Sequence, residues 1–427
     1  MAEAALGTAP ARAGRGGRLG RLPALVLGRL VEQASLGIGA LFLAARLGPS
    51  AFAPVSVLFV VNSLAVTLSD YGIGLAALRC TPGTHVRAGV LRRMRVGNLA
   101  GAVLAAGAGL AAGGTAGTIV GLGGCVWWAS GEAFVRKAAA INLGFAGEAA
   151  GGELAGAVVF GLVCAIAPGR HAVAIVGAAF VLKHALEAVA VRHWREVFSA
   201  AGCRPELGAL WSTQGLALAA GNVDYLLVGA FFGARAFAVY TLGFRVAVAL
   251  PSVLAYAAGR TAVADLGAAP TAAARGERYR AYVRPLFAAG VLGGLGAAAT
   301  GLVLPAVLGP GWGGLTPTIA VLALAMPWRM VVGQAGALMV AVHSSARLAR
   351  WEVARLAAFA LLLAGGAAAG FGGFVVAASL GWIVLTTAQH WAAARVAEIE
   401  PWGSLRVLAL AAVPLCVALG ATLGTWP

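Results

Sequence analysis

The chain has 427 residues, of which 60% are hydrophobic and 11% charged, and its mean hydropathy is +0.88. Soluble domains carry about 25% charged residues, so this composition excludes a soluble globular protein. The formal net charge of +16 comes almost entirely from arginine, since Lys137 and Lys183 are the only lysines.

Apolar runs of about 20 residues follow one another along the chain, and each is long enough to span a bilayer as a helix. Residues 1–22 precede the first run and predict a disordered basic tail. The runs are continuous rather than alternating, which favours helices over a β-barrel. The thirteen predicted spans are 24–45, 52–78, 97–113, 116–140, 149–167, 171–191, 209–231, 236–260, 285–308, 316–341, 352–370, 372–394 and 405–424.

Residues 222–251 repeat a stretch near the N-terminus without gaps. The aligned pairs include Leu41–Leu226, Gly48–Gly233, Phe52–Phe237, Phe59–Phe244, Arg93–Arg278 and Arg95–Arg280. We interpret the match as an internal duplication: an all-α protein with two six-helix lobes related by an axis along the membrane normal, plus one extra span. The predicted divisions are a tail 1–22, a lobe 23–195, a cytoplasmic linker 196–208, a lobe 209–395 and an additional span 396–427.

The basic residues fall almost entirely on one side of the predicted spans. With the N-terminus inside, 24 of the 31 arginines and lysines lie on the inner side and three on the outer side. This bias predicts a cytoplasmic N-terminus and accounts for the basic charge without nucleic acid. Loops are short, and the longest is predicted near residues 262–284.

Other residue patterns narrow the chemistry. The five cysteines form no CxxC spacing and the six histidines no HExxH motif, so neither a metal site nor a cofactor is predicted. Pro251, Pro305 and Pro327 are expected to bend or break spans. Seven tryptophans near predicted span ends, Trp194, Trp312 and Trp382 among them, are expected to be interfacial anchors.

Charges inside the predicted spans are the candidate functional residues, because a charge at mid-bilayer costs roughly 2.5–3.5 kcal/mol. Arg245 and Arg329 have no close partner in the sequence, and we expect them to bind an anion in a cavity. Arg29 and Glu32 share a helix face, as a neutral pair or as an anion contact beside a titratable carboxylate. Asp224 is either a proton or sodium site or a helix contact hydrogen-bonded to Asn222 or Gln214.

A second set of charged residues fits either a gate between lobes or a structural role. Its members are Asp70, Glu132, Lys137, Lys183 and Glu187, of which Lys183 and Glu187 form an i,i+4 pair.

Three stretches resemble bacterial polysaccharide flippases of the multidrug, oligosaccharidyl-lipid and polysaccharide exporter superfamily. They are LFLAARLGPSAFAPVSVLFVV with SDYGIGLAALR, NVDYLLVGAFFGARAFAVYTLGFRVAVALP, and VLPAVLGPGWGGLTPTIAVLALA. The resemblance covers about residues 20–395. That family has twelve or fourteen spans, so the thirteenth span here is a departure.

The resemblance implies a V-shaped bundle with a cationic cavity that moves undecaprenyl-diphosphate-linked sugars across the bacterial cytoplasmic membrane, in some members by ion-driven antiport. It implies that Arg29, Arg245 and Arg329 contact the anionic cargo and that Glu32 and Asp224 couple an ion. Polysaccharide polymerase and glycosyltransferases are the implied partners. A drug or metabolite antiporter of the same superfamily is the alternative, and a polyprenyl-linked glycosyltransferase or polymerase is a second one.

Overall fold

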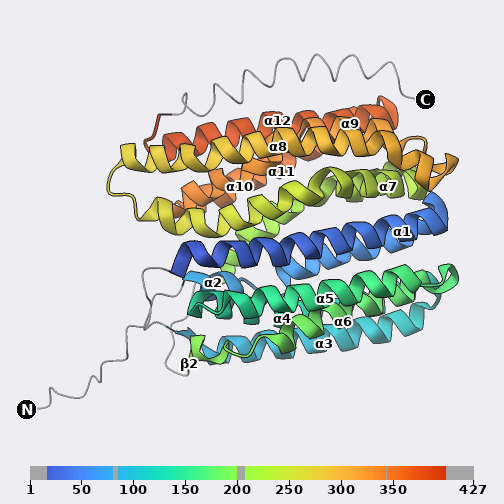
Figure 1. The fold of residues 1–427 in the computed structure, drawn as a ribbon, viewed down its shortest axis with the longest axis horizontal. Helices are drawn as coiled ribbons and strands as arrows, with labels where there is room; N and C mark the ends of the chain where they lie inside the picture. The colour runs from blue at the N-terminus through green and yellow to red at the C-terminus, as the bar shows by residue number, and fades with distance from the viewer. Residues whose placement is uncertain (1–16, 80–84, 200–206, 343, 401–427) are drawn as a thin grey trace, which may run out of the picture.

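A computed structural model describes residues 17–79, 85–199, 207–342 and 344–400. The described chain is almost entirely helical, and its helices lie side by side in one layered bundle (Figure 1). The first half contains α1 (Gly17–Leu68), α2 (Ile73–Arg79), β1 (Val86–Arg87), α3 (Ala88–Ala112), α4 (Gly114–Leu143), α5 (Ala146–Ile166), η1 (Gly169–His171), α6 (Ala172–Ala190), η2 (Arg195–Val197) and β2 (Phe198–Ser199). The second half contains α7 (Leu207–Gly267), α8 (Ala272–Leu308), η3 (Pro310–Trp312), α9 (Leu315–Leu324), α10 (Met326–Ala341), α11 (Ser345–Ala367) and α12 (Gly370–Val396).

Two glycines divide the longest helices. α1 has 52 residues and α7 has 61, far more than the roughly 20 that cross a bilayer. Each contains one non-helical glycine, Gly48 with φ 68° and ψ 170° and Gly233 with φ 77° and ψ −173°. Only glycine adopts this region of backbone space readily. α1 and α7 are therefore two spans each, and the aligned glycines of the repeat make the same turn.

The described helices form a membrane-spanning bundle of two lobes. Seven are long and apolar enough to cross a membrane, or eight if the bent pair α9–α10 is one span. α1 and α7 supply two spans each because of their glycine breaks. With α4 and α11, which pack among these helices, each lobe has six spans, which confirms the predicted fold class. The additional span expected at 405–424 lies outside the described residues.

Several boundaries differ from the sequence prediction. The long loop expected near 262–284 is wrong, because α7 continues to Gly267 and α8 already begins at Ala272. The first turn of α8 is capped by the Thr271 hydroxyl, which accepts a hydrogen bond from the Ala274 amide at 3.1 Å. α1 also begins at Gly17, inside the predicted tail, while residues 1–16 lie outside the described part of the chain.

One predicted proline break is present. The tenth span is bent by 43° between α9 and α10, where Pro327 occupies the first turn of α10. A proline cannot donate to the preceding turn, and its ring displaces the carbonyl it would have bonded. Pro305, in contrast, stays inside the continuous helix α8.

The two lobes meet along α1 and α7, which lie side by side in the centre of the bundle (Figure 1). Where α1 turns at Gly48, Phe52 packs edge-on against Trp312 of the second lobe at 5.8 Å. At the other end of the bundle, the Trp211 indole donates to the Leu68 carbonyl at 3.0 Å and stacks on Tyr71 at 6.0 Å. The lobes are therefore in contact at both ends.

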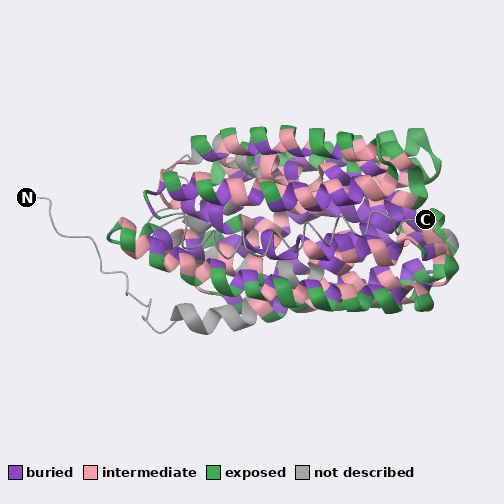
Figure 2. Cartoon of the chain, turned by 90° about the horizontal axis from the view of Figure 1, so that it is seen from above, coloured by how far each residue is buried: buried purple, intermediate pink, exposed green. Residues whose placement is uncertain are grey.

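Apolar side chains cover the outside of the bundle as well as its interior. Leu104, Leu110, Leu302 and Leu361 are among the most exposed large hydrophobic residues. Figure 2 shows exposed positions along the outer faces of the helices and buried ones along the middle of the bundle. An apolar exterior of this kind matches lipid rather than water.

Candidate functional site

Two arginines of the second lobe lie over aromatic rings beside the seam between α1 and α7. The Arg245 guanidinium on α7 lies 3.9 Å from the ring centre of Phe59 on α1, in the other lobe. The Arg329 guanidinium on α10 lies 4.0 Å from the ring of Phe244 and 3.9 Å from that of Trp382. Arg245 is twelve residues beyond Gly233, or about 18 Å along a helix, close to the middle of a ~30 Å hydrocarbon layer.

Both guanidinium groups retain unused hydrogen-bond donors. Nε of Arg245 and Nη1 of Arg329 are buried and have no hydrogen-bond partner among the described residues. A cation–π contact contributes about 0.5–2 kcal/mol, whereas an unsatisfied buried donor on a charged group costs more than 1–3 kcal/mol. The arrangement therefore favours a ligand that brings hydrogen-bond acceptors and negative charge.

Asp224 lies beside these arginines on α7. Its Oδ2 accepts from the Tyr240 hydroxyl at 2.6 Å and its Oδ1 from the Tyr225 amide at 2.9 Å. The expected contact with Asn222 is wrong, because the Asn222 amide donates to the Leu218 carbonyl instead, at 2.8 Å. The side chain of Gln214, the other expected partner, lies outside what the structure describes.

The same region unites three of the predicted site residues. Arg329 lies close enough to Asp224 for electrostatic attraction. Arg245 and Arg329 both lie within electrostatic range of Tyr225, the residue that follows Asp224. We call Asp224, Arg245 and Arg329, with the rings of Phe59 and Trp382, the seam site. It holds two cations and one carboxylate, so it is one positive charge in excess.

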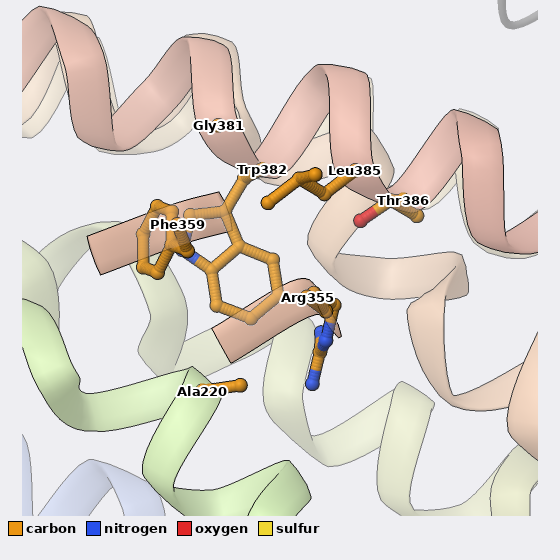
Figure 3. A pocket seen from close by; sticks show the side chains of 7 residues that line it. All are labelled: Ala220, Arg355, Phe359, Gly381, Trp382, Leu385 and Thr386. Atoms are coloured by element: carbon orange, nitrogen blue, oxygen red, sulfur yellow. The ribbon is translucent and has the colours of Figure 1, made fainter. Parts of the chain in front are cut away.

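A small pocket adjoins the seam site between α7, α11 and α12 (Figure 3). It is lined by Ala220, Arg355, Phe359, Gly381, Trp382, Leu385 and Thr386. Arg355 lies 5.5 Å from the Trp382 ring, so this ring contacts two guanidinium groups. Arg355 also forms an ion pair with Glu352 at 2.6 Å. The Trp382 indole nitrogen and the Thr386 hydroxyl are buried and have no partner within the described chain.

Sequence reasoning missed this pocket. Trp382 was expected to be an interfacial anchor, but its side chain is buried, as is that of Trp312. The i,i+3 spacing of Glu352 and Arg355 was the available signal, since such a pair within an apolar run indicates a charge that needs a partner.

The first lobe contains a separate network of buried charges, which we call the lobe-one network. Lys183 bonds Glu32 at 2.7 Å and Glu187 at 2.6 Å, and Lys137 bonds Glu187 at 3.0 Å and Glu153 at 3.1 Å. Arg29 is also paired with Glu32. The predicted i,i+3 and i,i+4 pairs are thus present, and four helices contribute to one chain of ion pairs.

The lobe-one network is balanced in charge, with three cations and three carboxylates. His184 extends it, since its Nδ1 lies 3.1 Å from Glu187 and its Nε2 lies 2.7 Å from the Asn62 amide oxygen. Buried charges are tolerated only when paired and hydrogen-bonded. Arg29 and Glu32, predicted as an anion contact and an ion-coupling residue, therefore lie in a self-neutralising cluster.

The remaining predicted residues lie at the end of the bundle where α1 begins. Asp70 is fully buried and accepts from the amides of Gly72 at 3.0 Å and Gly74 at 2.9 Å, which caps the start of α2. Glu132 accepts from Arg95 at 2.5 and 2.9 Å and pairs with Arg136 at 3.2 Å. Within the described ranges, no group of His, Cys, Asp or Glu side chains is arranged to hold a metal ion.

No protein-family model matches the chain, and no curated protein matches it at a significant level. Several solved structures, in contrast, are similar to the chain. An inward-facing multidrug resistance MATE family transporter of the MOP superfamily superposes with a TM-score of 0.59 at 16% identity, over 86% of this chain and 95% of that one. An outward-facing transporter of the same description gives 0.58 at 13% identity, over 88% and 96%.

A third structure, a MOP superfamily transporter from Pyrococcus furiosus, gives 0.55 at 14% identity over 91% and 96% of the two chains. This transporter is described as having a binding pocket of reverse polarity, which suggests a different function for it. At these identities the likeness concerns the fold. The chain is an all-α polytopic membrane protein with the two-lobed fold of MATE transporters.

Proposed function

We propose that this protein is a flippase that carries an undecaprenyl-diphosphate-linked oligosaccharide across the bacterial cytoplasmic membrane by alternating access. The observation that carries the proposal is the pair of mid-membrane arginines, Arg245 and Arg329, each stacked on aromatic rings with a buried donor unused. One guanidinium group can bind two oxygens of a phosphate at once, so the two arginines together suit a diphosphate.

The seam position supports movement of the cargo between the two faces. Arg245 reaches from the second lobe onto Phe59 of the first, so a ligand that draws this guanidinium away also loosens the contact between lobes. Solved structures of the same fold face inward in one case and outward in another. Asp224, attracted to Arg329, is the proposed ion-coupling residue because its charge state sets how strongly Arg329 attracts an anion.

A drug or metabolite antiporter of the same fold is the alternative. Its cavity would need to attract cations, and the buried carboxylate of Asp224 is the observation in its favour. The excess positive charge of the seam site opposes it. The polarity of the site thus separates the two functions, and the Pyrococcus transporter, described as having a pocket of reverse polarity, provides a precedent within this fold.

The proposed cellular setting follows from the cargo. The N-terminus is proposed to lie in the cytoplasm, on the strength of the arginine bias. Glycosyltransferases would build the lipid-linked unit on that side, and a polysaccharide polymerase would use it on the other.

The test compares the two functions in one set of variants. In the native host, Arg245→Ala with Arg329→Ala is expected to block polymer export while lipid-linked repeat units accumulate inside. Export at the wild-type level in this double variant overturns the proposal. In liposomes of purified protein, efflux of a fluorescent cation that is lost with Asp224→Asn would instead establish the antiporter.

A further inference from the structure

Three arginines surround one tryptophan at the end of the first lobe where α1 begins. Trp194 follows α6 and is buried. The guanidinium carbons of Arg95 on α3, Arg136 on α4 and Arg195 in η2 lie 5.0, 4.9 and 5.5 Å from its ring. Because all three lie near the same ring, the guanidinium groups also lie close to one another. We call the four residues the Trp194 cluster.

The cluster is held in place by its surroundings. Glu132 receives two hydrogen bonds from Arg95, at 2.5 and 2.9 Å, and also pairs with Arg136. Arg136 donates a further hydrogen bond to the Ala188 carbonyl at 2.9 Å, near the end of α6. Strands β1 and β2 pair beside it, with Val86 opposite Phe198. The guanidinium groups of Arg95 and Arg136 are thus already oriented before any ligand arrives, which lowers the entropy lost on binding.

The local charges of the cluster are not balanced. The three guanidinium groups are paired with one carboxylate, Glu132, and Arg195 forms no ion pair within the described residues. Two further carboxylates lie at this end, Glu196 next to Arg195 and Glu148 bonded to His193. The indole ring compensates each cation by only about 0.5–2 kcal/mol. Arg92 and Arg192 are also exposed at this end of the bundle. This contrasts with the balanced lobe-one network, and it leaves a site for a bound anion.

An exposed apolar stripe begins at the same place on α3. Val96, Leu99 and Val103 are 61%, 51% and 63% exposed, and their i, i+3 and i+7 spacing puts them on one helix face. Arg92 precedes Val96 by four residues and shares that face. A basic head group site is therefore continuous with an apolar track that runs along an outer helix of the first lobe.

We propose that the Trp194 cluster binds the phosphate of a membrane lipid whose hydrocarbon chain lies along the α3 stripe. The depth fits, because Arg136 lies seven residues from the end of α4, or about 10 Å, where guanidinium groups reach lipid head groups. The proposed occupant is an anionic glycerophospholipid of the bilayer, which presents phosphate above its hydrocarbon chains; an isoprenoid diphosphate has the same two parts and is the alternative outcome of the test. The inference is independent of the proposed function.

The experiment is lipid retention by the purified full-length protein, measured by native mass spectrometry after incubation with phosphatidylglycerol or phosphatidylcholine. Wild type is expected to retain phosphatidylglycerol preferentially. Arg195→Gln removes the guanidinium without an ion pair and is expected to weaken retention about fivefold, and Arg92→Gln in addition about another fivefold. Arg350→Gln, an exposed arginine at the same end of the second lobe, is the matched control and should change nothing.

Competition identifies the source of the phosphate. Displacement of phosphatidylglycerol by farnesyl diphosphate at concentrations where inorganic diphosphate has no effect would support the site as one for isoprenoid diphosphates. Displacement by neither compound, with the Arg195→Gln loss still present, would support it as a site for a bilayer phospholipid. Equal retention by wild type, Arg195→Gln and the double variant overturns the proposal, as does an equal loss in Arg350→Gln.

Discussion

The two lobes solve the problem of buried charge in opposite ways. In the first lobe, Lys137 and Lys183 bond carboxylates on α1, α5 and α6, so the charges cancel inside the lobe. In the second lobe, Arg245 and Arg329 lie on aromatic rings and each keeps a buried nitrogen without a partner. A network whose charges already cancel gains little from an added anion, whereas a guanidinium that lies on aromatic rings gains a counterion. The difference supports the proposal that the second lobe uses these arginines for binding, whereas the charges of the first lobe cancel one another.

The contrast between the two lobes is tested most directly at Glu187, which contacts Lys137, Lys183 and His184. Glu187→Leu leaves three buried cations with only two carboxylates and is expected to cost about 3–5 kcal/mol of stability. A large fall in melting temperature, monitored by size-exclusion chromatography in detergent after heating, would show this loss of stability. The Lys183→Leu, Glu187→Leu double variant leaves Lys137 with Glu153 and Glu32 with Arg29, so it should recover much of the loss. A double variant as unstable as the single one would contradict a charge-balanced network.

The opposite outcome is expected at the seam site. Arg245→Ala with Arg329→Ala should weaken binding of a polyprenyl diphosphate roughly hundredfold, from about 1.5–3 kcal/mol for each charged hydrogen bond. Calorimetric titration of the purified protein would measure it, and the melting temperature should fall less than in Glu187→Leu. Arg235→Ala removes an exposed arginine whose contact is the Gly311 carbonyl and serves as the control. Equal binding by the double variant and this control would show that the seam arginines hold no anion.

The lobes should respond alike where the repeat makes them alike. Gly48→Ala and Gly233→Ala force a side chain into a backbone region that is nearly restricted to glycine, at about 1–3 kcal/mol each. A Cβ at either position meets no atom within 4 Å, so the cost is backbone strain. Gly37→Ala, in a regular part of α1 with the same open space, should be neutral or stabilising. Thermal melting of the three variants tests this, and unequal losses at Gly48 and Gly233 would show that the two turns are not equivalent.

The smallest effect is expected where the lobes touch. Trp211→Phe keeps an aromatic ring near Tyr71 but removes the hydrogen bond to the Leu68 carbonyl, worth about 1 kcal/mol. The population open at that end should rise about fivefold. Spin labels at the exposed residues Arg93 and Glu277 would report it as a longer distance. Trp128→Phe, on an exposed face of α4, should leave the distance unchanged.

The regular parts of this molecule were readable from its sequence. Twelve predicted spans have helices at their positions, and the alignment of Gly48 with Gly233 located both turns of the long helices, because hydropathy and glycine act locally. The region 262–284 misled the prediction, since its arginines and acidic residues resemble a loop although they lie on extended ends of α7 and α8.

The candidate site was only partly readable. The depth of Arg245 and Arg329 in apolar runs marked them as unusual charges, and the structure places Asp224 beside Arg329. Its partner Tyr240 is sixteen residues away, across a turn, so helical spacing gave no sign of it. The link between Lys137 and Glu153 joins two different helices, and the stacking of Arg329 on Trp382 joins α10 to α12. Such contacts depend on how helices pack, which a single sequence does not specify.

The turns at Gly48 and Gly233 also limit how the molecule can move. Each joins two long helices through one residue, so neither hairpin has slack that would let one arm slide past the other. A tilt of such a stiff pair about its midpoint moves its two ends in opposite directions at once. Opening at one membrane face is then mechanically tied to closing at the other, and a leak path open to both faces is avoided by the geometry of two single-residue joints.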